Sequence, residues 1–506
     1  MRTAYRVETV RAAERALLER LPDGALMQRA AAGLAAVCLR MLRPGPVTGA
    51  RVVLLVGTGD NGGDALWAGA RLAARGVAVT AVLLDPDRAH PAGLAALRRR
   101  GARIVGTADA LAEDGAPRVW GRPGNPPALV VDGLLGIGGR GGLRSPAAEV
   151  VRRATATGAP VLAVDLPSGV EADTGEVRGE AVDAAVTVTF GTHKPALLVA
   201  PARYRAGVVH AVDIGLGPEL ARFGGEAGPE VVAPEHADIA ALLPTPGPES
   251  DKYRRGVVGV AAGSERYPGA AVLAVSAALR GGAGAVRYLG PPAEAVLARH
   301  PEVLVGHGRV QAWVVGPGLD DADEGRERLA AVLADDVPTV VDADALALFR
   351  DALPADRRAP LILTPHAGEA ARLLGVDREE VEARRLWAVR ELASRFGATT
   401  LLKGSTTLVT VPPTEGPPPP VIANPTGTPW LATAGTGDVL AGLIGSLLAA
   451  GLAPGEAATA GAYLHGLAAR LCPEPPVASD VAAALPAARR LIAEPDPGPP
   501  ADRPAG

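Results

Sequence analysis

The chain contains little cysteine, few aromatic residues and no excess of positive charge. Its two cysteines, Cys38 and Cys472, are far apart and outside any Cys-x-x-Cys spacing, which argues against a disulfide framework or a zinc–thiolate site. Aromatic residues make up only 3% of the chain, so Ala, Val and Leu must fill the core, as in helices packed on a parallel sheet. The net charge of −4 lacks the basic footprint typical of a nucleic-acid-binding protein.

Long hydrophobic runs are also missing. The longest apolar stretch, residues 439–453, includes Gly442, Gly445 and Gly451 and is shorter than the roughly 20 residues that span a bilayer. It therefore predicts a buried helix. Residues 1–21 carry charges throughout and have no apolar segment of the kind found in secretory signals. We expect a cytoplasmic protein without membrane attachment.

Short runs of Val, Leu and Ile alternate with Ala-, Leu- and Arg-rich helical stretches along most of the chain. This alternation predicts an α/β fold, with parallel strands covered by helices on both faces. The pattern restarts at residue 257, which in a chain of 506 residues predicts two large domains. The predicted strands are 52–56, 77–84, 128–131, 161–164 and 186–190, then 257–261, 286–288, 313–315, 339–341, 361–363 and 400–402.

A Gly-, Pro- and Glu-rich segment separates the two patterns. It predicts domains at residues 1–222 and 249–494, joined by a linker at 223–248 that includes a short helix near 237–243. Residues 495–506 are Pro-rich and cannot bury much surface, which predicts a disordered tail. The Pro- and Gly-rich segment 116–127 is predicted to be a surface loop.

In the N-terminal half, the strand at 52–56 leads directly into GTGDNGGDA, residues 57–65, and then into a helix. Glycines at such a turn let main-chain amides approach an anionic ligand. Gly57-x-Gly59-x-x-Gly62 also matches the dinucleotide fingerprint, with Asp85 where a ribose-binding acid would stand. A Rossmann oxidoreductase and a purely structural turn are both open alternatives at this point.

Two more polar clusters follow later strands of this half. Asp132 precedes a Gly-rich loop at 136–142, and Asp165 begins the segment that reaches Ser168 and Gly169. A single acid at a strand end can simply cap the next helix. Three clusters together indicate a site, because ligands of a doubly wound sheet bind at the carboxyl ends of its strands.

These residues resemble the NAD(P)H-hydrate epimerase domain, whose pattern is Gly-Asn-Asn-Gly-Gly-Asp-Gly, then Asp before a Gly-rich loop, then Asp-Ile-Pro-Ser-Gly. The resemblance covers residues 1–215 and includes the segment from Thr189 to Pro195. It implies a Rossmann-like, doubly wound, three-layer domain. Asp60 departs from the pattern by replacing the first Asn, and Ala65 departs by replacing the last Gly. Asp60 places another negative charge beside an anionic ligand.

The resemblance also implies a role for each cluster. Asp165 is the expected proton-transfer residue, with Asp132 as the alternative, because epimerising a carbinolamine carbon requires proton movement on and off its hydroxyl. Asn61, Asp132 and Ser168 would supply oxygen ligands to a potassium ion. The expected substrate-binding residues are Asp60, Asn61, Gly62, Gly63, Asp64, Gly136, Ile137, Gly138, Gly139, Arg140, Gly141, Gly142 and Asp165.

In the C-terminal half, Gly435, Gly437 and Asp438 open the long apolar helix. Amides at a helix start can stabilise a transferring phosphoryl group while Asp438 accepts a proton from a substrate hydroxyl. The alternative reading is that Asp438 only caps the helix. The glycines on both sides favour the catalytic reading.

Two further motifs follow predicted strands. Residues 403–407, Lys-Gly-Ser-Thr-Thr, suit phosphate binding. His366-x-x-Glu369 could suggest a metal pair, but zinc would need a third ligand motif. We expect instead an orienting histidine and a glutamate that serves magnesium-bound phosphates.

The order of these motifs resembles the ribokinase superfamily, and within it the ADP/ATP-dependent NAD(P)H-hydrate dehydratases. The match covers residues 245–492, implies a ribokinase-like three-layer α/β domain, and departs where Asp251 replaces a usual His. The motifs that carry it are Lys252 with Arg255-Gly256, Gly263-Ser264, Tyr267 to Ala271, Gly281 to Gly284, Gly316 to Leu319, Asp342 to Leu346, and the three described above.

This second resemblance implies phosphorylation of the nicotinamide-ring hydroxyl with Asp438 as base, followed by loss of phosphate. ADP is the expected co-substrate, giving AMP, with Mg²⁺ at this site. Ala270, Gly318, His366 and Asp438 would contact the hydrate, whereas Lys403, Gly404, Ser405, Thr406, Thr407 and Gly437 would contact the nucleotide.

Together the two halves predict a bifunctional enzyme that repairs hydrated NADH and NADPH, with small molecules as its partners and self-association into a homo-oligomer. The main alternative is a C-terminal small-molecule kinase joined to a non-catalytic nucleotide- or RNA-binding module, as in RNA-decapping scaffolds. The presence of Asp64, Asp132 and Asp165 favours the catalytic reading of the N-terminal half.

Overall fold

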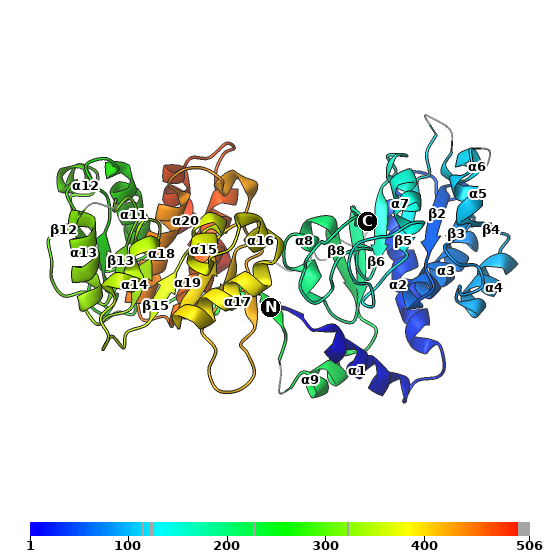
Figure 1. The fold of residues 1–506 in the computed structure, drawn as a ribbon, viewed down its shortest axis with the longest axis horizontal. Helices are drawn as coiled ribbons and strands as arrows, with labels where there is room; N and C mark the ends of the chain where they lie inside the picture. The colour runs from blue at the N-terminus through cyan, green and yellow to red at the C-terminus, as the bar shows by residue number, and fades with distance from the viewer. Residues whose placement is uncertain (114–115, 122–124, 226–227, 321–322, 494–506) are drawn as a thin grey trace, which may run out of the picture. The chain divides into compact units, whose positions relative to one another are not determined.

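The computed structural model describes residues 1–113, 116–121, 125–225, 228–320 and 323–493. The chain divides into two compact units, one of Thr3–Val231 and one that joins Met1–Arg2 to the chain from Val232 onward (Figure 1). The tail predicted at 495–506 lies outside the described residues.

The N-terminal unit is built on a fully parallel sheet, and the predicted α/β class is confirmed. Its strand order among the described residues is β4-β3-β2-β5-β6-β7-β8, with every neighbouring pair parallel. The strands are β2 (Arg51–Val56), β3 (Ala78–Leu83), β4 (Arg103–Gly106), β5 (Leu129–Gly133), β6 (Val161–Val164), β7 (Val186–Phe190) and β8 (Val208–Val212). The sequence did not predict β4 and β8, because these edge strands are partly exposed and lack continuous apolar runs.

Alternate residues of the central strand β2 enter two separate cores. Val52, Leu54 and Val56 pack on one face, and Val53 and Leu55 pack on the other. The first core is closed by α2 (Ala25–Met41), α3 (Asp60–Ala73) and α4 (Pro91–Arg99), and the second by α5 (Thr107–Leu111), α6 (Ala116–Trp120) and α7 (Ala147–Thr155). The result is a three-layer domain.

Helix α6 corrects the prediction that residues 116–127 form only a surface loop. Trp120 is buried in the second core, and its indole nitrogen donates a hydrogen bond to the carbonyl oxygen of Ala110 (2.8 Å).

The topological switch point of this sheet lies between β2 and β5. The chain runs outward from β2 through β3 to β4, then returns to β5 on the other side of β2. Crevices at such points, beyond the carboxyl ends of the strands, are the usual ligand sites of doubly wound sheets. Gly57 leaves β2 here and has no room for a side chain, since a Cβ would stand 1.9 Å from the carbonyl oxygen of Leu134.

The C-terminal unit contains a larger, mixed sheet. Its order among the described residues is β1-β9-β18-β17-β16-β15-β14-β13-β10-β11-β12. The strands from β16 to β12 in this order are parallel, as expected. Strand β17, which the sequence did not predict, pairs antiparallel with both β16 and β18. The strands are β1 (Arg2–Ala4), β9 (Val231–Ala233), β10 (Val257–Ala261), β11 (Ala285–Leu289), β12 (Leu304–Val305), β13 (Ala312–Val315), β14 (Thr339–Val341), β15 (Leu361–Leu363), β16 (Thr399–Leu402), β17 (Leu408–Thr410) and β18 (Val421–Ala423).

Helices cover both faces of this sheet. Val258 and Val260 of β10 face a core with α11 (Pro268–Arg280), α18 (Thr436–Ala449), α19 (Pro454–Leu471) and α20 (Ala478–Ala493). Val257 and Ala261 face the opposite core, with α13 (Asp323–Ala334) and α14 (Ala345–Ala352). Helix α18 confirms the buried helix predicted at 439–453, and among the described residues no helix is long and apolar enough to cross a membrane.

The segment 223–248, expected to be a linker, contains strand β9 and helix α10 (His236–Leu242), and the boundary between the two units falls within β9. The remaining helices are α1 (Val7–Leu18), α8 (Ala202–Arg205), α9 (Gly217–Phe223), α12 (Ala293–Arg299), α15 (Ala367–Leu374), α16 (Arg378–Ala383) and α17 (Arg385–Phe396), with short 3-10 turns η1 (Pro195–Leu197) and η2 (Pro429–Leu431).

Candidate active sites

At the switch point of the N-terminal unit, three predicted residues meet around one buried carboxylate. Asp132 of β5 is fully buried and accepts hydrogen bonds from the hydroxyl (2.7 Å) and the main-chain amide (2.8 Å) of Ser168. Asn61 in the first turn of α3 donates its amide to the carbonyl oxygens of Val164 (2.6 Å) and Leu135 (3.2 Å). The Ser168 hydroxyl also reaches the Leu135 carbonyl oxygen (3.2 Å), so Asn61 and Ser168 share one main-chain partner.

This cluster has the donor chemistry of a monovalent or other hard cation site. It brings together the side-chain oxygens of Asp132 and Ser168 with the main-chain oxygens of Leu135 and Val164, both of which accept from the Asn61 amide group. Burial raises the pKa of Asp132 to about 6, against the opposing effect of the hydrogen bonds from Ser168. A cation there would offset the cost of burying the carboxylate. The oxygen atoms of this cluster therefore suit a hard cation, and the potassium ion expected from the sequence stays a prediction.

A second buried carboxylate, Asp165, stands beside this cluster in an ion pair. Its backbone is left-handed (φ 64°) directly after β6, and its Oδ1 accepts hydrogen bonds from the Lys194 ammonium and from the Thr189 hydroxyl (2.9 Å). Lys194 is itself buried and also donates to Thr189 Oγ1 (3.0 Å). The second oxygen of Asp165 receives no hydrogen bond among the described residues, so it can face a substrate.

Further acids surround this ion pair. Asp64 of α3 is buried, and its Oδ1 has no hydrogen-bond partner among the described residues. Burial, and then the charges of Asp165, Asp60 and Glu14, hold the pKa of Asp64 well above its usual range. Burial likewise raises the pKa of Glu14, which comes from α1. The site therefore places the Asp165–Lys194 ion pair beside a second carboxyl group, Asp64, whose pKa is raised.

Sequence reasoning did not assign roles to Lys194 and Glu14. Lys194 belonged to the quoted resemblance, and the signal that could have found it was a lone lysine just beyond the strand 186–190. Glu14 gave no signal, because an acid on an amphipathic helix is normally a solvated residue.

The Gly-rich loop lies against Asn61. A Cβ at Gly136 would stand 2.4 Å from Asn61 Oδ1, so this position requires glycine. Gly141 and Gly142 have left-handed backbones (φ 64° and 42°), and the amide of Gly141 donates to Glu171 Oε1 (2.7 Å). Gly138 and Arg140 are exposed at the loop tip, where a phosphate could reach their amides.

The two departures from the epimerase pattern have different structural settings. Ala65 is fully buried, and its methyl group occupies space left by Gly133 of β5, where a Cβ would stand only 2.8 Å away. The change from glycine is thus accommodated within the chain. Asp60 is exposed at the start of α3, and its charge contributes to the raised pKa of Asp64 and of Glu14.

At the carboxyl edge of the second sheet, a lysine bridges two strands. Lys403 follows β16, and its Nζ lies 2.7 Å from Oδ1 of Asp342, which follows β14. The hydroxyl of Thr364, after β15, donates to the same Asp342 oxygen (2.8 Å). A Cβ on Gly437 would stand 3.4 Å from Lys403 Nζ, so the start of α18 reaches this group. Residues that follow three strands and one that opens a helix therefore meet at one point.

Asp438, the expected base, lies in the first turn of α18 beside this group. Burial raises the pKa of Asp438 to about 7; Asp342 and Asp344 act in the same direction, and Lys403 opposes them. A pKa near neutrality suits a general base, because a usable fraction is ionised while its affinity for the proton remains high.

His366 and Glu369 form the first turn of α15 and fix each other. The main-chain amide of His366 donates to Glu369 Oε2 (2.7 Å), while the amides of Gly368 (3.0 Å) and Glu369 (3.2 Å) donate to His366 Nδ1. The neutral ring therefore carries its proton on Nε2, 3.4 Å from Glu369 Oε1, and burial lowers its pKa. Glu369 Oε2 also lies 3.9 Å from Lys403 Nζ.

Asp342 and Glu369 thus place two carboxylates on either side of Lys403. Mg²⁺ is commonly held by one or two carboxylates together with substrate phosphates and water. These two side chains fit that role. Among the described residues there is no group of three or more His, Cys, Asp or Glu side chains that could hold a metal by themselves.

Ala270 and Gly318, two further predicted contacts, lie against each other. Gly318 follows β13 with a left-handed backbone (φ 59°), and a Cβ there would stand 2.8 Å from that of Ala270 in α11. This close approach leaves no space for a larger side chain at position 318.

The Lys403–Thr407 segment is held by a residue that the sequence did not single out. Arg385, at the start of α17, is buried and donates to the carbonyl oxygens of Leu402 (3.3 Å), Lys403 (3.1 Å) and Thr406 (2.9 Å). A Cβ on Gly404 would stand 2.7 Å from the same guanidinium. Arg385 therefore sets the curvature of the segment. Nothing in the sequence distinguishes it from Arg384 beside it.

Both units match known proteins. A family model described as YjeF-related protein N-terminus matches residues 23–196, and one described as NAD(P)H-hydrate dehydratase matches residues 258–488. The bifunctional NAD(P)H-hydrate repair enzyme of Mycobacterium tuberculosis is 49% identical over 467 residues, covering 90% of this chain and 91% of the relative. The enzyme with the same description from Escherichia coli is 35% identical over 430 residues, covering 82% and 80%.

Solved structures match the C-terminal unit. The ADP/ATP-dependent NAD(P)H-hydrate dehydratase of Bacillus subtilis, co-crystallised with ATP and Mg²⁺, is 30% identical, with a TM-score of 0.47. The match covers 51% of this chain and 97% of that one.

Proposed function

The chain belongs to the family of bifunctional NAD(P)H-hydrate repair enzymes, and we propose that its N-terminal unit interconverts the R and S hydrates while its C-terminal unit dehydrates the S form, converting ADP to AMP and phosphate. The observation that carries this proposal is that each sheet presents a carboxylate beside a buried or half-buried lysine at its carboxyl edge: Asp165 with Lys194, and Asp438 beside Lys403.

For epimerisation, Asp165 acts as the proton-transfer residue. Lys194 stabilises its negative charge at Oδ1, and Oδ2 faces the substrate hydroxyl. Asp132, the alternative from the sequence, is less suited because Ser168 and Leu134 occupy its oxygens and it is fully buried. Asp64, whose pKa is raised mainly by burial, is the complementary proton donor in this proposal.

The cluster of Asn61, Asp132 and Ser168 holds potassium in this proposal. The cation would neutralise Asp132 and anchor the start of the Gly-rich loop through the Leu135 carbonyl oxygen. The amides of Gly62, Gly63 and residues 136–142 then hold the phosphates of the substrate.

For dehydration, Asp438 takes the proton from the ring hydroxyl as this oxygen attacks the terminal phosphorus of ADP. AMP leaves. The lone pair of the ring nitrogen then expels phosphate, which departs with the electron pair of its C–O bond, and loss of a proton from the adjacent ring carbon restores the dihydropyridine. Lys403 and the amides at the start of α18 stabilise the charge on the transferring group. Magnesium, held by Asp342 and Glu369 with the phosphates, would supply further charge neutralisation. His366, Ala270 and Gly318 orient the hydrate.

The decisive experiment mixes purified chain with R and S NADH hydrates, K⁺, Mg²⁺ and ADP, and follows the NADH absorbance band. Complete conversion of both epimers with formation of AMP supports both activities. Conversion that stops once the S form is exhausted would contradict the epimerase activity proposed for the N-terminal unit. Stable phosphorylation of an alcohol without NADH formation would instead indicate that the C-terminal unit is a small-molecule kinase. The cytoplasmic location and self-association expected from the sequence stay predictions.

A further inference from the structure

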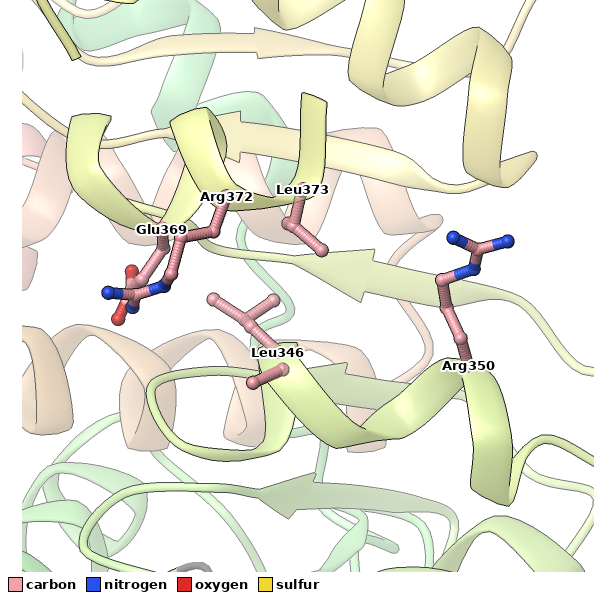
Figure 2. Close-up of a pocket in the computed structure, with 6 residues that line it drawn as sticks. Leu346, Arg350, Glu369, Arg372 and Leu373 are labelled. Carbon is pink, nitrogen blue, oxygen red and sulfur yellow. The ribbon is translucent and has the colours of Figure 1, made fainter. Parts of the chain in front are cut away.

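Helices α14 and α15 enclose a pocket of about 220 Å³ next to the dehydratase site. Figure 2 shows Glu369 and Arg372 of α15 at one end, Arg350 of α14 toward the other, and the apolar side chains of Leu346 and Leu373 between them. No assigned role in the repair reaction includes this pocket.

The pocket is continuous with the site through Glu369. One oxygen of this carboxylate lies 3.9 Å from Lys403 Nζ and the other 3.4 Å from His366 Nε2. Arg372 is also close enough to His366 to contribute to lowering the pKa of its ring. A ligand that contacts His366 can therefore extend into the pocket without leaving the protein surface.

The charges that line the pocket favour an anion. The carboxylate of Glu369 already has partners. It lies near the Lys403 ammonium and contacts the main-chain amide and the ring Nε2 of His366. The guanidinium groups of Arg350 and Arg372 make no hydrogen bond or ion pair in the part of the chain that the structure describes; Arg350 stacks at 5.7 Å on the ring of Phe396. The two cations thus keep all their donors for a ligand.

The size and position of the pocket indicate which part of a substrate it can bind. Ligand pockets of roughly 300–1,000 Å³ hold whole drug-sized molecules, so 220 Å³ holds only a fragment of a dinucleotide. ADP is assigned to the ends of β16 and α18, beyond Lys403, whereas this pocket lies on the His366 side, where the hydrate is expected. A hydrated dinucleotide must extend beyond its reacting ring, and its far end is an adenosine that bears phosphate.

We propose that the pocket between α14 and α15 receives the phosphate-bearing adenosine end of the hydrate, with the base on Leu346 and Leu373 and its phosphate groups at the two ends of the pocket, toward Arg372 and toward Arg350. The proposal rests on the dehydratase function above. In this proposal the two arginines determine specificity. NADPH hydrate carries one phosphate more than NADH hydrate, so the arginines bind it more strongly.

The test measures dehydration of purified S hydrates by the full-length chain with saturating ADP and Mg²⁺. In Arg350→Ala and Arg372→Ala we expect KM for S-NADPH hydrate to rise about fivefold each, the effect of losing a largely exposed charge pair. KM for S-NADH hydrate should rise less, and kcat and KM for ADP should stay the same. The matched control is Arg378→Ala, an exposed arginine on the neighbouring α16 that pairs with Glu382 (2.8 Å).

Three results would overturn the proposal: unchanged KM for both hydrates, a rise confined to KM for ADP, or equal losses in Arg378→Ala, which would indicate only a general charge effect. An unchanged kcat for dehydration in the same variants reports that the C-terminal unit is intact. If the unaltered chain forms no NADH from S hydrate, the dehydratase function itself fails, which is a separate outcome.

Discussion

The ammonium of Lys403 lies 2.7 Å from the carboxylate of Asp342 and so joins the carboxyl ends of β16 and β14, across β15. Asp438 lies beside this pair. Burial and the charges of Asp342 and Asp344 raise the pKa of Asp438, whereas the charge of Lys403 lowers it.

The pH dependence of dehydration should follow from this balance. Asp438 must be ionised to accept a proton, and its pKa is near 7, so kcat/KM should rise with pH through about 7 and fall nearly tenfold per unit below about pH 6. Asp438→Asn should reduce dehydration by at least about 10²-fold while epimerisation continues. A flat profile between pH 5 and 8 in the unaltered chain would contradict the assignment.

Epimerisation should depend on the Asp165–Lys194 pair. Asp165→Asn removes the proton acceptor and should slow interconversion of the R and S hydrates by about 10²–10⁴-fold, measured by chromatography of the epimers. Asp132→Asn should instead weaken the response to added K⁺. The matched control is Asp183→Asn, which removes an exposed ion pair with Arg205 (2.6 Å) in the same unit. If Asp132→Asn abolishes turnover at every K⁺ concentration and Asp165→Asn does not, the two roles are reversed.

Arg385 should act as a positioning residue for the nucleotide. Arg385→Lys keeps the charge but loses the guanidinium group, whose Nη2 reaches three carbonyl oxygens. We expect KM for ADP to rise at least about tenfold with a smaller change in kcat, and Arg385→Gln to be worse. Arg384→Lys is the control, because Arg384 contacts Glu380 (2.6 Å) and the Trp387 ring instead. Equal effects in the two lysine variants would refute the positioning role.

Acid stability of the C-terminal unit should depend on His465. This histidine of α19 is buried, its Nε2 has no partner among the described residues, and burial lowers its pKa to about 4. The unfolded chain, with an ordinary pKa near 6.5, binds the proton more readily. The contribution of the neutral His465 to the free energy of unfolding is therefore fully present above about pH 6.5. It is lost as the pH falls toward 4, by up to about 3 kcal/mol.

Calorimetry of the full chain can follow this loss in the unfolding transition that ADP shifts upward. His465→Leu should reduce the difference between pH 7 and pH 5 in that transition. The transition that ADP does not shift serves as the control. An unchanged difference in the variant would show that other groups cause the acid sensitivity.

The sequence predicted the strands that are continuous apolar runs and the clusters that follow them, because both are local patterns. It missed β17 and β18, whose antiparallel pairing depends on neighbours rather than on composition. Lys194, Glu14 and Arg385 were missed for a related reason. Each owes its role to contacts with residues distant in sequence, as Arg385 does with the carbonyl oxygens after β16.

Because one chain carries two compact units, each with its own core and its own candidate site, the two catalytic capacities are produced in a fixed one-to-one ratio. Any change in expression scales both together, so an excess of the unreactive epimer cannot arise from unequal synthesis. A destabilising mutation confined to one core would break that equality, leaving cells that accumulate a single epimer or both.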